Sequence, residues 1–137
     1  MFQVARKFRV LQVGGHDLGS LFNQKSNVEW DYFDVGLFDF ESGYQDVVVH
    51  ILDEKGQFDF VFVREKYSDS LMKLLSLVST PYNTVIDNEY WDNQYQQDKT
   101  IQRNFIKPLI YENEEQLQQK LEAVTFPGQY GDKVKPI

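Results

Sequence analysis

A glycine-rich loop is the first candidate for chemistry in this sequence. The segment GGHDLG spans residues 14–19 and directly follows the apolar run at 8–13. Glycines at such a position allow a tight turn and would let a phosphate approach backbone amides at a helix N-terminus. The spacing fits neither G-x-G-x-x-G nor G-x-x-x-x-G-K-S/T, so the loop is kept only as a candidate small-molecule site. Its candidate ligand-binding residues are Gly14, Gly15, His16 and Asp17.

His16 is the candidate for acid-base chemistry. Imidazole is the side-chain group best suited to proton transfer near neutral pH. The second histidine, His50, lies opposite the apolar stripe of a predicted helix and is expected at the surface. Ser20 near His16 and Asp17 completes a Ser-His-Asp set in composition, but three residues within one turn rarely satisfy triad geometry. No G-x-S-x-G elbow occurs, so no catalytic residue is predicted.

Carboxylates follow two other apolar runs. Asp34 lies about where a dinucleotide-binding fold keeps its ribose-binding acid, and it joins the candidate ligand-binding residues. Asp87, Glu89 and Asp92 could chelate a hard cation such as magnesium or calcium. Charged residues clustered in a loop are more often simply solvated, so we expect no metal site and no cofactor.

Five β-prone runs would position these residues, and helical patterns separate them. The predicted strands are 8–13, 28–35, 58–63, 84–87 and 109–112. The run at 58–63 is almost wholly apolar and should be central, whereas 28–35 alternates over its first half and should lie at an edge. The alternation predicts an α/β fold with three layers, whose five-stranded, mostly parallel sheet is Rossmann-like or flavodoxin/receiver-like. In such a sheet, ligands bind at the carboxyl ends of the strands.

The third strand ends in Val63, Arg64 and Glu65. A receiver domain needs a phosphoacceptor aspartate at this position. We therefore expect the shape of a receiver without its aspartyl-phosphate chemistry.

Two helices are predicted by their caps and apolar spacing. Ser68 can cap a helix whose apolar residues follow the i, i+3, i+4, i+7 template. Asn113 is the expected N-cap of a last helix, with Gln116 three residues on. The apolar stripes are Leu71, Leu74, Leu75 and Val78 in the first helix, and Leu117, Leu121 and Val124 in the second.

Two further segments leave alternatives open. Residues 44–55 fit a helix that ends at Gly56, or a strand that a hairpin joins to the next strand. We prefer the helix because it continues the alternation. The polar stretch 90–105 fits a long loop or a weakly amphipathic helix. Its aromatic residues, Tyr90, Trp91 and Tyr95, are expected to be anchors, with sugar stacking as the alternative.

Composition limits the class of protein. A chain of 137 residues with 42% hydrophobic residues suits one globular domain. A net charge of −7 disfavours binding to nucleic acid, and the absence of cysteine suits a cytoplasm. No apolar run approaches the roughly 20 residues of a membrane span, so no direct span is expected. We expect an α/β domain at 1–125 and a linker-like tail at 126–137 that leads towards a downstream domain.

Four stretches carry a resemblance to a known family. They are FRVLQVGGHDL, WDYFDV, ILDEKGQFDFVFV and FPGQYGDKV. Together they resemble the amino-terminal region of the Asp-two-type accessory secretory proteins of Gram-positive bacteria. These are components of the accessory Sec system, which exports heavily glycosylated serine-rich-repeat adhesins.

The resemblance implies a receiver- or Rossmann-like leading region. In that family it precedes an α/β-hydrolase-like portion, whose Ser-His-Asp/Glu set is thought to O-acetylate sugars on the adhesin. None of those catalytic positions can be carried over, because the elbow serine does not occur in this chain.

The expected function is therefore that of a non-catalytic interaction or scaffold domain that supports adhesin export. The expected partners are other accessory Sec proteins, with the glycosylated adhesin as a further candidate. The expected location is the cytoplasm, at the membrane periphery through partners. The alternative is a small-molecule or nucleotide-binding enzyme domain that uses the loop Gly14–Gly19.

Overall fold

Five parallel strands form one sheet at the centre of the molecule. The computed structural model describes residues 8–22, 28–34, 58–78, 84–99, 101 and 106–124. The strands are β1 (Phe8–Val13), β2 (Val28–Phe33), β3 (Phe60–Val63), β4 (Thr84–Asp87) and β5 (Lys107–Leu109). Their order in the sheet is β2-β1-β3-β4-β5, and each neighbouring pair is parallel. This order is the flavodoxin-like one, which confirms the predicted α/β sheet.

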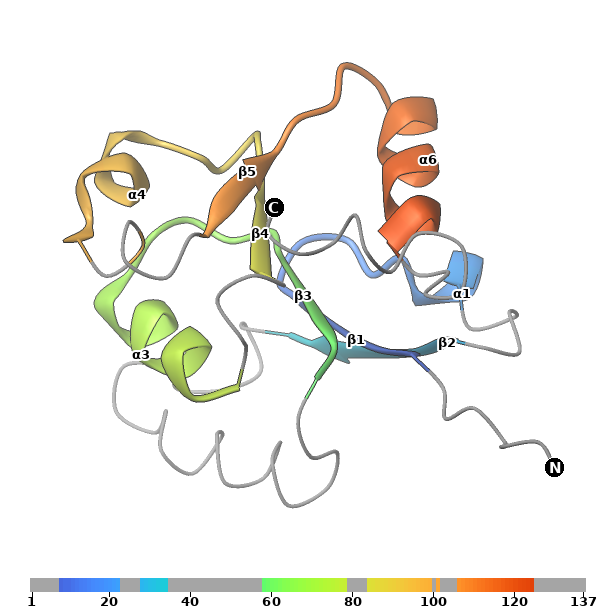
Figure 1. Ribbon diagram of the computed structural model, residues 1–137, viewed down its shortest axis with the longest axis horizontal. Helices are drawn as coiled ribbons and strands as arrows, with labels where there is room; N and C mark the ends of the chain where they lie inside the picture. The colour runs from blue at the N-terminus through green and yellow to red at the C-terminus, as the bar shows by residue number, and fades with distance from the viewer. Residues whose placement is uncertain are drawn as a thin grey trace, which may run out of the picture.

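Helices cover both faces of the sheet. They are α1 (Gly19–Phe22), α3 (Asp69–Val78), α4 (Asn93–Gln97) and α6 (Glu114–Val124). Figure 1 shows α3 and α4 on one side of the sheet and α1 and α6 on the other. The chain moves from β1 to β2 in one direction across the sheet and from β3 through β4 to β5 in the other, so right-handed crossovers place α1 opposite α3 and α4. None of the helices described between residues 8 and 124 is long and apolar enough to cross a bilayer.

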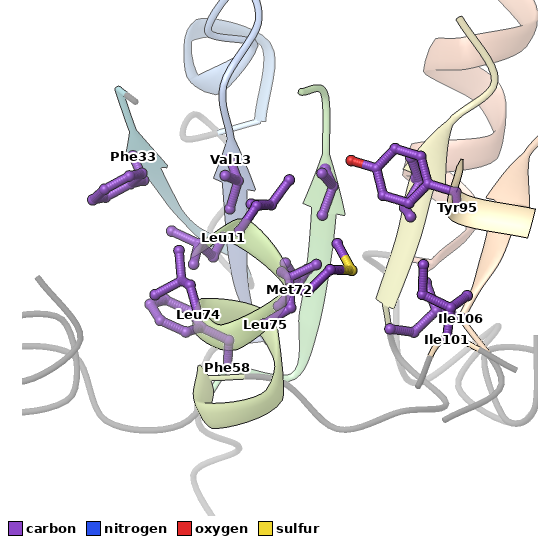
Figure 2. Close-up of a cluster of buried hydrophobic side chains, with 14 residues drawn as sticks. Leu11, Val13, Phe33, Phe58, Met72, Leu74, Leu75, Tyr95, Ile101 and Ile106 are labelled. Atoms are coloured by element: carbon purple, nitrogen blue, oxygen red, sulfur yellow. The ribbon is translucent and has the colours of Figure 1, made fainter. Parts of the chain in front are cut away.

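The two faces of the sheet have separate hydrophobic cores. On one face, Leu11 and Val13 of β1 pack with Leu71, Leu74 and Leu75 of α3 (Figure 2). On the other face, the buried residues include Val10, Phe22, Phe60, Phe62, Leu117 and Leu121. Successive strand residues point to opposite faces, so one nearly continuous apolar strand can serve both cores. The central position of β3 and the edge position of β2 are confirmed.

Both predicted helix caps are confirmed. The hydroxyl oxygen of Ser68 accepts a hydrogen bond from the amide of Leu71 at 3.1 Å. Asn113 Oδ1 accepts from the amide of Gln116 at 3.0 Å, and Gln116 Oε1 accepts from the amide of Glu112 at 2.9 Å. These bonds satisfy amides that lack partners at the first turn of a helix.

The polar stretch at 90–105 contains the short helix α4. Asp92 caps it, since its side chain accepts hydrogen bonds from the amides of Gln94 and Tyr95. Tyr95 is fully buried, stacks on Trp91 with ring centroids 5.7 Å apart, and donates to the carbonyl of Glu65 at 2.7 Å. The aromatic residues are therefore anchors, as expected, and Tyr95 offers no exposed surface for sugar stacking.

The prediction for the fifth strand is wrong. That strand is Lys107–Leu109, not 109–112, so it contains Pro108 in its middle. Proline is tolerated there because β5 is an edge strand and one side of it needs no hydrogen bond to a neighbouring strand. The second strand ends at Phe33 instead of residue 35, and the third begins at Phe60 instead of residue 58. The predicted helix at 44–55, His50, Gly56 and the tail at 126–137 lie outside the described residues.

Candidate functional site

A cleft of about 420 Å³ lies at the carboxyl ends of the strands, between α1 and α6. Loops that follow four of the strands contribute to it, through His16, Arg64, Glu89 and Tyr111. The crevice beside the strand ends is where this class of sheet binds ligands. The volume lies within the range of pockets that hold small molecules or single side chains of a partner.

Gly14 and Gly15 form the turn that leads into the cleft wall. Their φ angles are 74° and 71°, a left-handed conformation that glycine adopts without strain. The amide of Gly14 donates to the carbonyl of Phe33 at 3.0 Å, which ties the turn to β2. A Cβ atom at Gly14 would overlap the side chain of Glu65, and one at Gly15 would lie 2.7 Å from Cβ of Arg64. The glycines therefore allow a close approach of the chain's own side chains.

Gln12 holds the loop in place from below. It is fully buried at the end of β1, and its side chain makes three hydrogen bonds to loop backbone. Nε2 donates to the carbonyls of Gly14 at 2.8 Å and His16 at 2.7 Å. Oε1 accepts from the amide of Leu18 at 3.0 Å. One side chain thus satisfies backbone groups on both sides of the turn, which fixes the shape of this wall.

Glu65, which follows β3, places its side chain against Gly14 of the turn. Burial raises the pKa of Glu65 above its ordinary value; a hydrogen bond from the backbone of Gly15 opposes this rise, and the charge of Asp34 adds to it. Tyr32 donates to the carbonyl of Gly15 at 2.7 Å. Burial, followed by the charge of Asp34, raises the pKa of Tyr32. The side chain of Glu65 therefore occupies the space beside Gly14, and the carboxyl groups of Glu65 and Asp34 disfavour a phosphate there.

A buried ion pair joins the ends of β3 and β4. Arg64 Nε lies 3.0 Å from Asp87 Oδ2, and the side chain of Asp87 is fully buried. Arg64 Nη1 also donates to the carbonyl of His16 at 3.0 Å. The guanidinium thus connects the loop after β1 to the end of β4. A buried carboxylate needs such compensation, because removing its partner leaves a buried charge.

Tyr111 completes this network from the segment after β5. Its hydroxyl oxygen lies 2.7 Å from Asp87 Oδ1 and 2.8 Å from Oδ2. Burial, together with the hydrogen bond to Asp87, raises the pKa of Tyr111, so its phenol stays protonated and donates. The amide of Glu89 donates to Asp87 Oδ1 at 2.9 Å. Asp87 therefore joins three segments of the chain at the strand ends.

The five candidate ligand-binding residues do not all reach the cleft. His16 and Asp17 are exposed and line the cleft. Gly14 lies against the side chain of Glu65, and Gly15 lies against that of Arg64. Asp34, which follows β2, acts on Glu65 through its charge. The structure thus brings His16 and Asp17 to the cleft and leaves Asp34 outside its lining.

The carboxylates considered for a cation have separate positions and roles. Asp87 is engaged with Arg64 and Tyr111, Asp92 caps α4, and Glu89 lines the cleft. Across the ranges that the structure describes, no group of three or more His, Asp or Glu side chains could hold a metal ion.

Sequence reasoning misses Gln12 and underrates Arg64. A signal for Gln12 exists, since it is the one polar side chain among the last four residues of β1 and directly precedes Val13 and the two glycines. In the sequence, Arg64 is noticed only because it lies at the end of the third strand, where a receiver domain has its phosphoacceptor aspartate. Its pairing with Asp87 joins residues 23 positions apart, which no local pattern indicates.

Comparison with known proteins agrees with the resemblance seen in the sequence. The family described as the accessory Sec system GspB-transporter matches residues 8–137. An accessory Sec system protein of the Asp-two type from Staphylococcus aureus (strain NCTC 8325 / PS 47) is 50% identical over 131 residues, which cover 96% of this chain. The chain spans 25% of the length of that relative. No solved structure shows a significant match. Because the family matches residues 8–137 and this relative is 50% identical over nearly the whole chain, the chain belongs to the family of Asp-two-type accessory Sec system proteins.

Proposed function

We propose that this chain is a non-catalytic interaction domain of an accessory Sec component. In this proposal it supports the export of glycosylated serine-rich-repeat adhesins by holding other accessory Sec proteins, and the adhesin is a further partner. It acts in the cytoplasm, at the membrane periphery through those partners. The proposal assigns no O-acetyl transfer to these 137 residues.

One observation carries the proposal: the polar groups at the strand ends serve the fold itself. Arg64 is paired with Asp87, Asp87 accepts from Tyr111, and Gln12 is engaged by the loop backbone. Nucleotide-binding and receiver domains keep such positions open for phosphate or a cation. Here Glu65 fills the space beside the glycine turn. What the cleft exposes instead is apolar side chain with a charged rim, which suits a macromolecular contact.

A thermal-shift measurement separates this function from that of a nucleotide-binding enzyme domain. We expect no change in Tm when ATP, NAD or MgCl₂ is added at millimolar concentration. A ligand at 100 times its Kd would stabilise the fold by about 2.7 kcal/mol. That stabilisation would raise Tm by several degrees, so a reproducible rise would refute the proposal.

Export in cells tests the positive half of the proposal. A strain whose accessory Sec component lacks residues 8–124 should place less adhesin on its surface and recover fewer accessory Sec proteins with the tagged component. Wild-type export and recovery after that deletion would contradict the proposal. Immunoblotting of the truncated protein provides the control for its abundance.

The small-molecule alternative keeps one observation in its favour. His16 and Asp17 both line the cleft, at the edge of the sheet where this fold binds ligands. In our proposal these two residues contact a partner protein instead. The same thermal-shift measurement, repeated with a panel of small molecules, tests the alternative.

A further inference from the structure

We infer that the cleft between α1 and α6 binds an apolar side chain of a partner polypeptide, flanked in that partner by lysine or arginine. The inference rests on the proposed function and names the chemistry of its contact. Its two parts are an apolar floor and an acidic rim, which come from different segments of the chain.

The floor of the cleft is built from both helices. Phe22 of α1 and Leu117 and Leu121 of α6 line it and are buried in the core beneath. Phe22 stacks on Trp30 of β2, with ring centroids 4.7 Å apart and an interplanar angle of 13°. These three side chains are at most 5% exposed, so they fix the shape of the floor as part of the packed core. The apolar surface that an incoming side chain can reach in the lining comes from the half-buried Leu18 and from Leu21.

Leu21 extends this floor into solvent. It lines the cleft, and 49% of its surface is exposed. Among the residues that the structure describes, only Leu21 and Ile110 are exposed large hydrophobic side chains. When a partner covers an exposed leucine and the apolar cleft beside it, the burial of apolar surface favours binding. The arrangement therefore favours an apolar occupant.

The rim of the cleft is negative. Asp17, Glu89 and Glu114 line it, and all three are exposed. The basic side chain in the lining, Arg64, is paired with buried Asp87 at 3.0 Å. The rim is therefore complementary to cations beside the apolar side chain, and the chain's net charge of −7 adds long-range attraction for a basic partner. The same field repels phosphorylated or acidic ligands.

The test uses the intact protein and fluorescein-labelled hexapeptides. The probe GKLFKG carries the inferred chemistry, GELFEG reverses its charge, and GKSSKG removes its apolar side chains. We expect GKLFKG to bind at least about tenfold more tightly than either control, measured by fluorescence anisotropy. Binding of GKLFKG should weaken as salt is raised from about 0.05 to about 0.5 M, because salt screens the rim.

Matched variants locate the binding. Leu21→Ser and Glu114→Lys should each weaken GKLFKG binding by at least about fivefold, a loss of one large contact. Ile110→Ser removes the other exposed hydrophobic side chain, and Glu115→Lys reverses the next charge on α6; neither residue lines the cleft. Both controls should bind like wild type. Melting curves of all four variants confirm that they are folded.

Five results would overturn the inference, three of them from the peptide measurements. The three are equal affinity for GKLFKG and GELFEG, equal weakening by the cleft variants and their controls, and no binding of GKLFKG at millimolar concentration. A small molecule that binds and is blocked by Leu21→Ser would also overturn it. The proposed function fails separately if the intact protein binds GKLFKG yet recovers no accessory Sec protein. Recovery of those proteins equally well with Leu21→Ser would leave the proposed function standing and overturn the inference that the cleft makes the contact.

Discussion

Replacing Gln12 by methionine tests whether one buried amide shapes the cleft wall. Methionine is unbranched and of similar length, so it fills the same space while removing every hydrogen bond of the side chain. Three bonds are lost: two from Nε2 to the carbonyls of Gly14 and His16, and one to Oε1 from the amide of Leu18. The His16 carbonyl keeps its bond from Arg64, whereas Gly14 itself is buried.

The loss of stability can be estimated from these contacts. A typical hydrogen bond contributes about 1 kcal/mol net, so three bonds contribute about 3 kcal/mol. Burying the methionine thioether in place of the amide recovers on the order of 1 kcal/mol. We therefore expect Gln12→Met to lower the free energy of unfolding by about 2 kcal/mol. A smaller effect would require the loop to move and rehydrate its carbonyls.

Urea unfolding measures this loss. With a slope of about 2 kcal/mol per molar urea, the transition midpoint should fall by about 1 M. Gln119→Met on the exposed face of α6 is the matched control and should change stability by less than about 0.5 kcal/mol. If Gln12→Met loses no more than this control, the amide does not hold the loop, and our account of the cleft wall is wrong.

The remaining predictions concern the neighbouring groups. Asp87→Ala leaves Arg64 without its buried partner and should cost about 3–5 kcal/mol in urea unfolding; a loss under about 1 kcal/mol would contradict the pairing. Gly14→Ala should cost at least about 1–2 kcal/mol, because its φ is 74° and its Cβ would overlap Glu65, and truncating Glu65 to alanine in the same chain should restore part of the loss. The pKa of the Glu65 carboxyl is raised in the fold, so folding favours its protonated form. Glu65→Gln tests this, because the amide cannot ionise. The free energy of unfolding of the wild type should therefore fall relative to that of Glu65→Gln as pH rises above the ordinary value of 4.5. A wild type that instead gains stability relative to Glu65→Gln between about pH 4 and about pH 7 would refute the sign.

The hydrophobic pattern of the sequence locates most of the strands. It does not show the order of the strands in the sheet, and that order decides which strand is an edge and which polar residue is buried. Strands β1 and β4 begin and end where the apolar runs do, since both are buried along most of their length. The predicted position of the fifth strand is wrong because proline usually ends a strand, and only the sheet order shows that β5 is an edge. Local sequence cannot show that Asp87 is buried beneath Arg64 and Tyr111, because that depends on three strands meeting.

The same limit applies to the candidate site. A glycine pair after a strand indicates a turn, and the turn is present. Whether the turn receives phosphate or a side chain depends on the residue types at the end of β3, and there Glu65 takes the space. His16 and Asp17 could be placed at the strand ends from sequence, but the apolar floor between α1 and α6 joins residues about 100 positions apart.

Pro108 determines how the sheet can meet other chains. The carbonyl of Leu109 accepts from the amide of Asn88, so the polar groups of Leu109 point towards β4 and those of its neighbour Pro108 point outward. That outward nitrogen carries no hydrogen, so a strand laid along this edge would meet a missing donor in the middle of a three-residue strand. The missing donor therefore disfavours growth of the sheet by strand addition on the β5 side. The same proline makes this edge a poor template for joining copies of the protein into a continuous sheet.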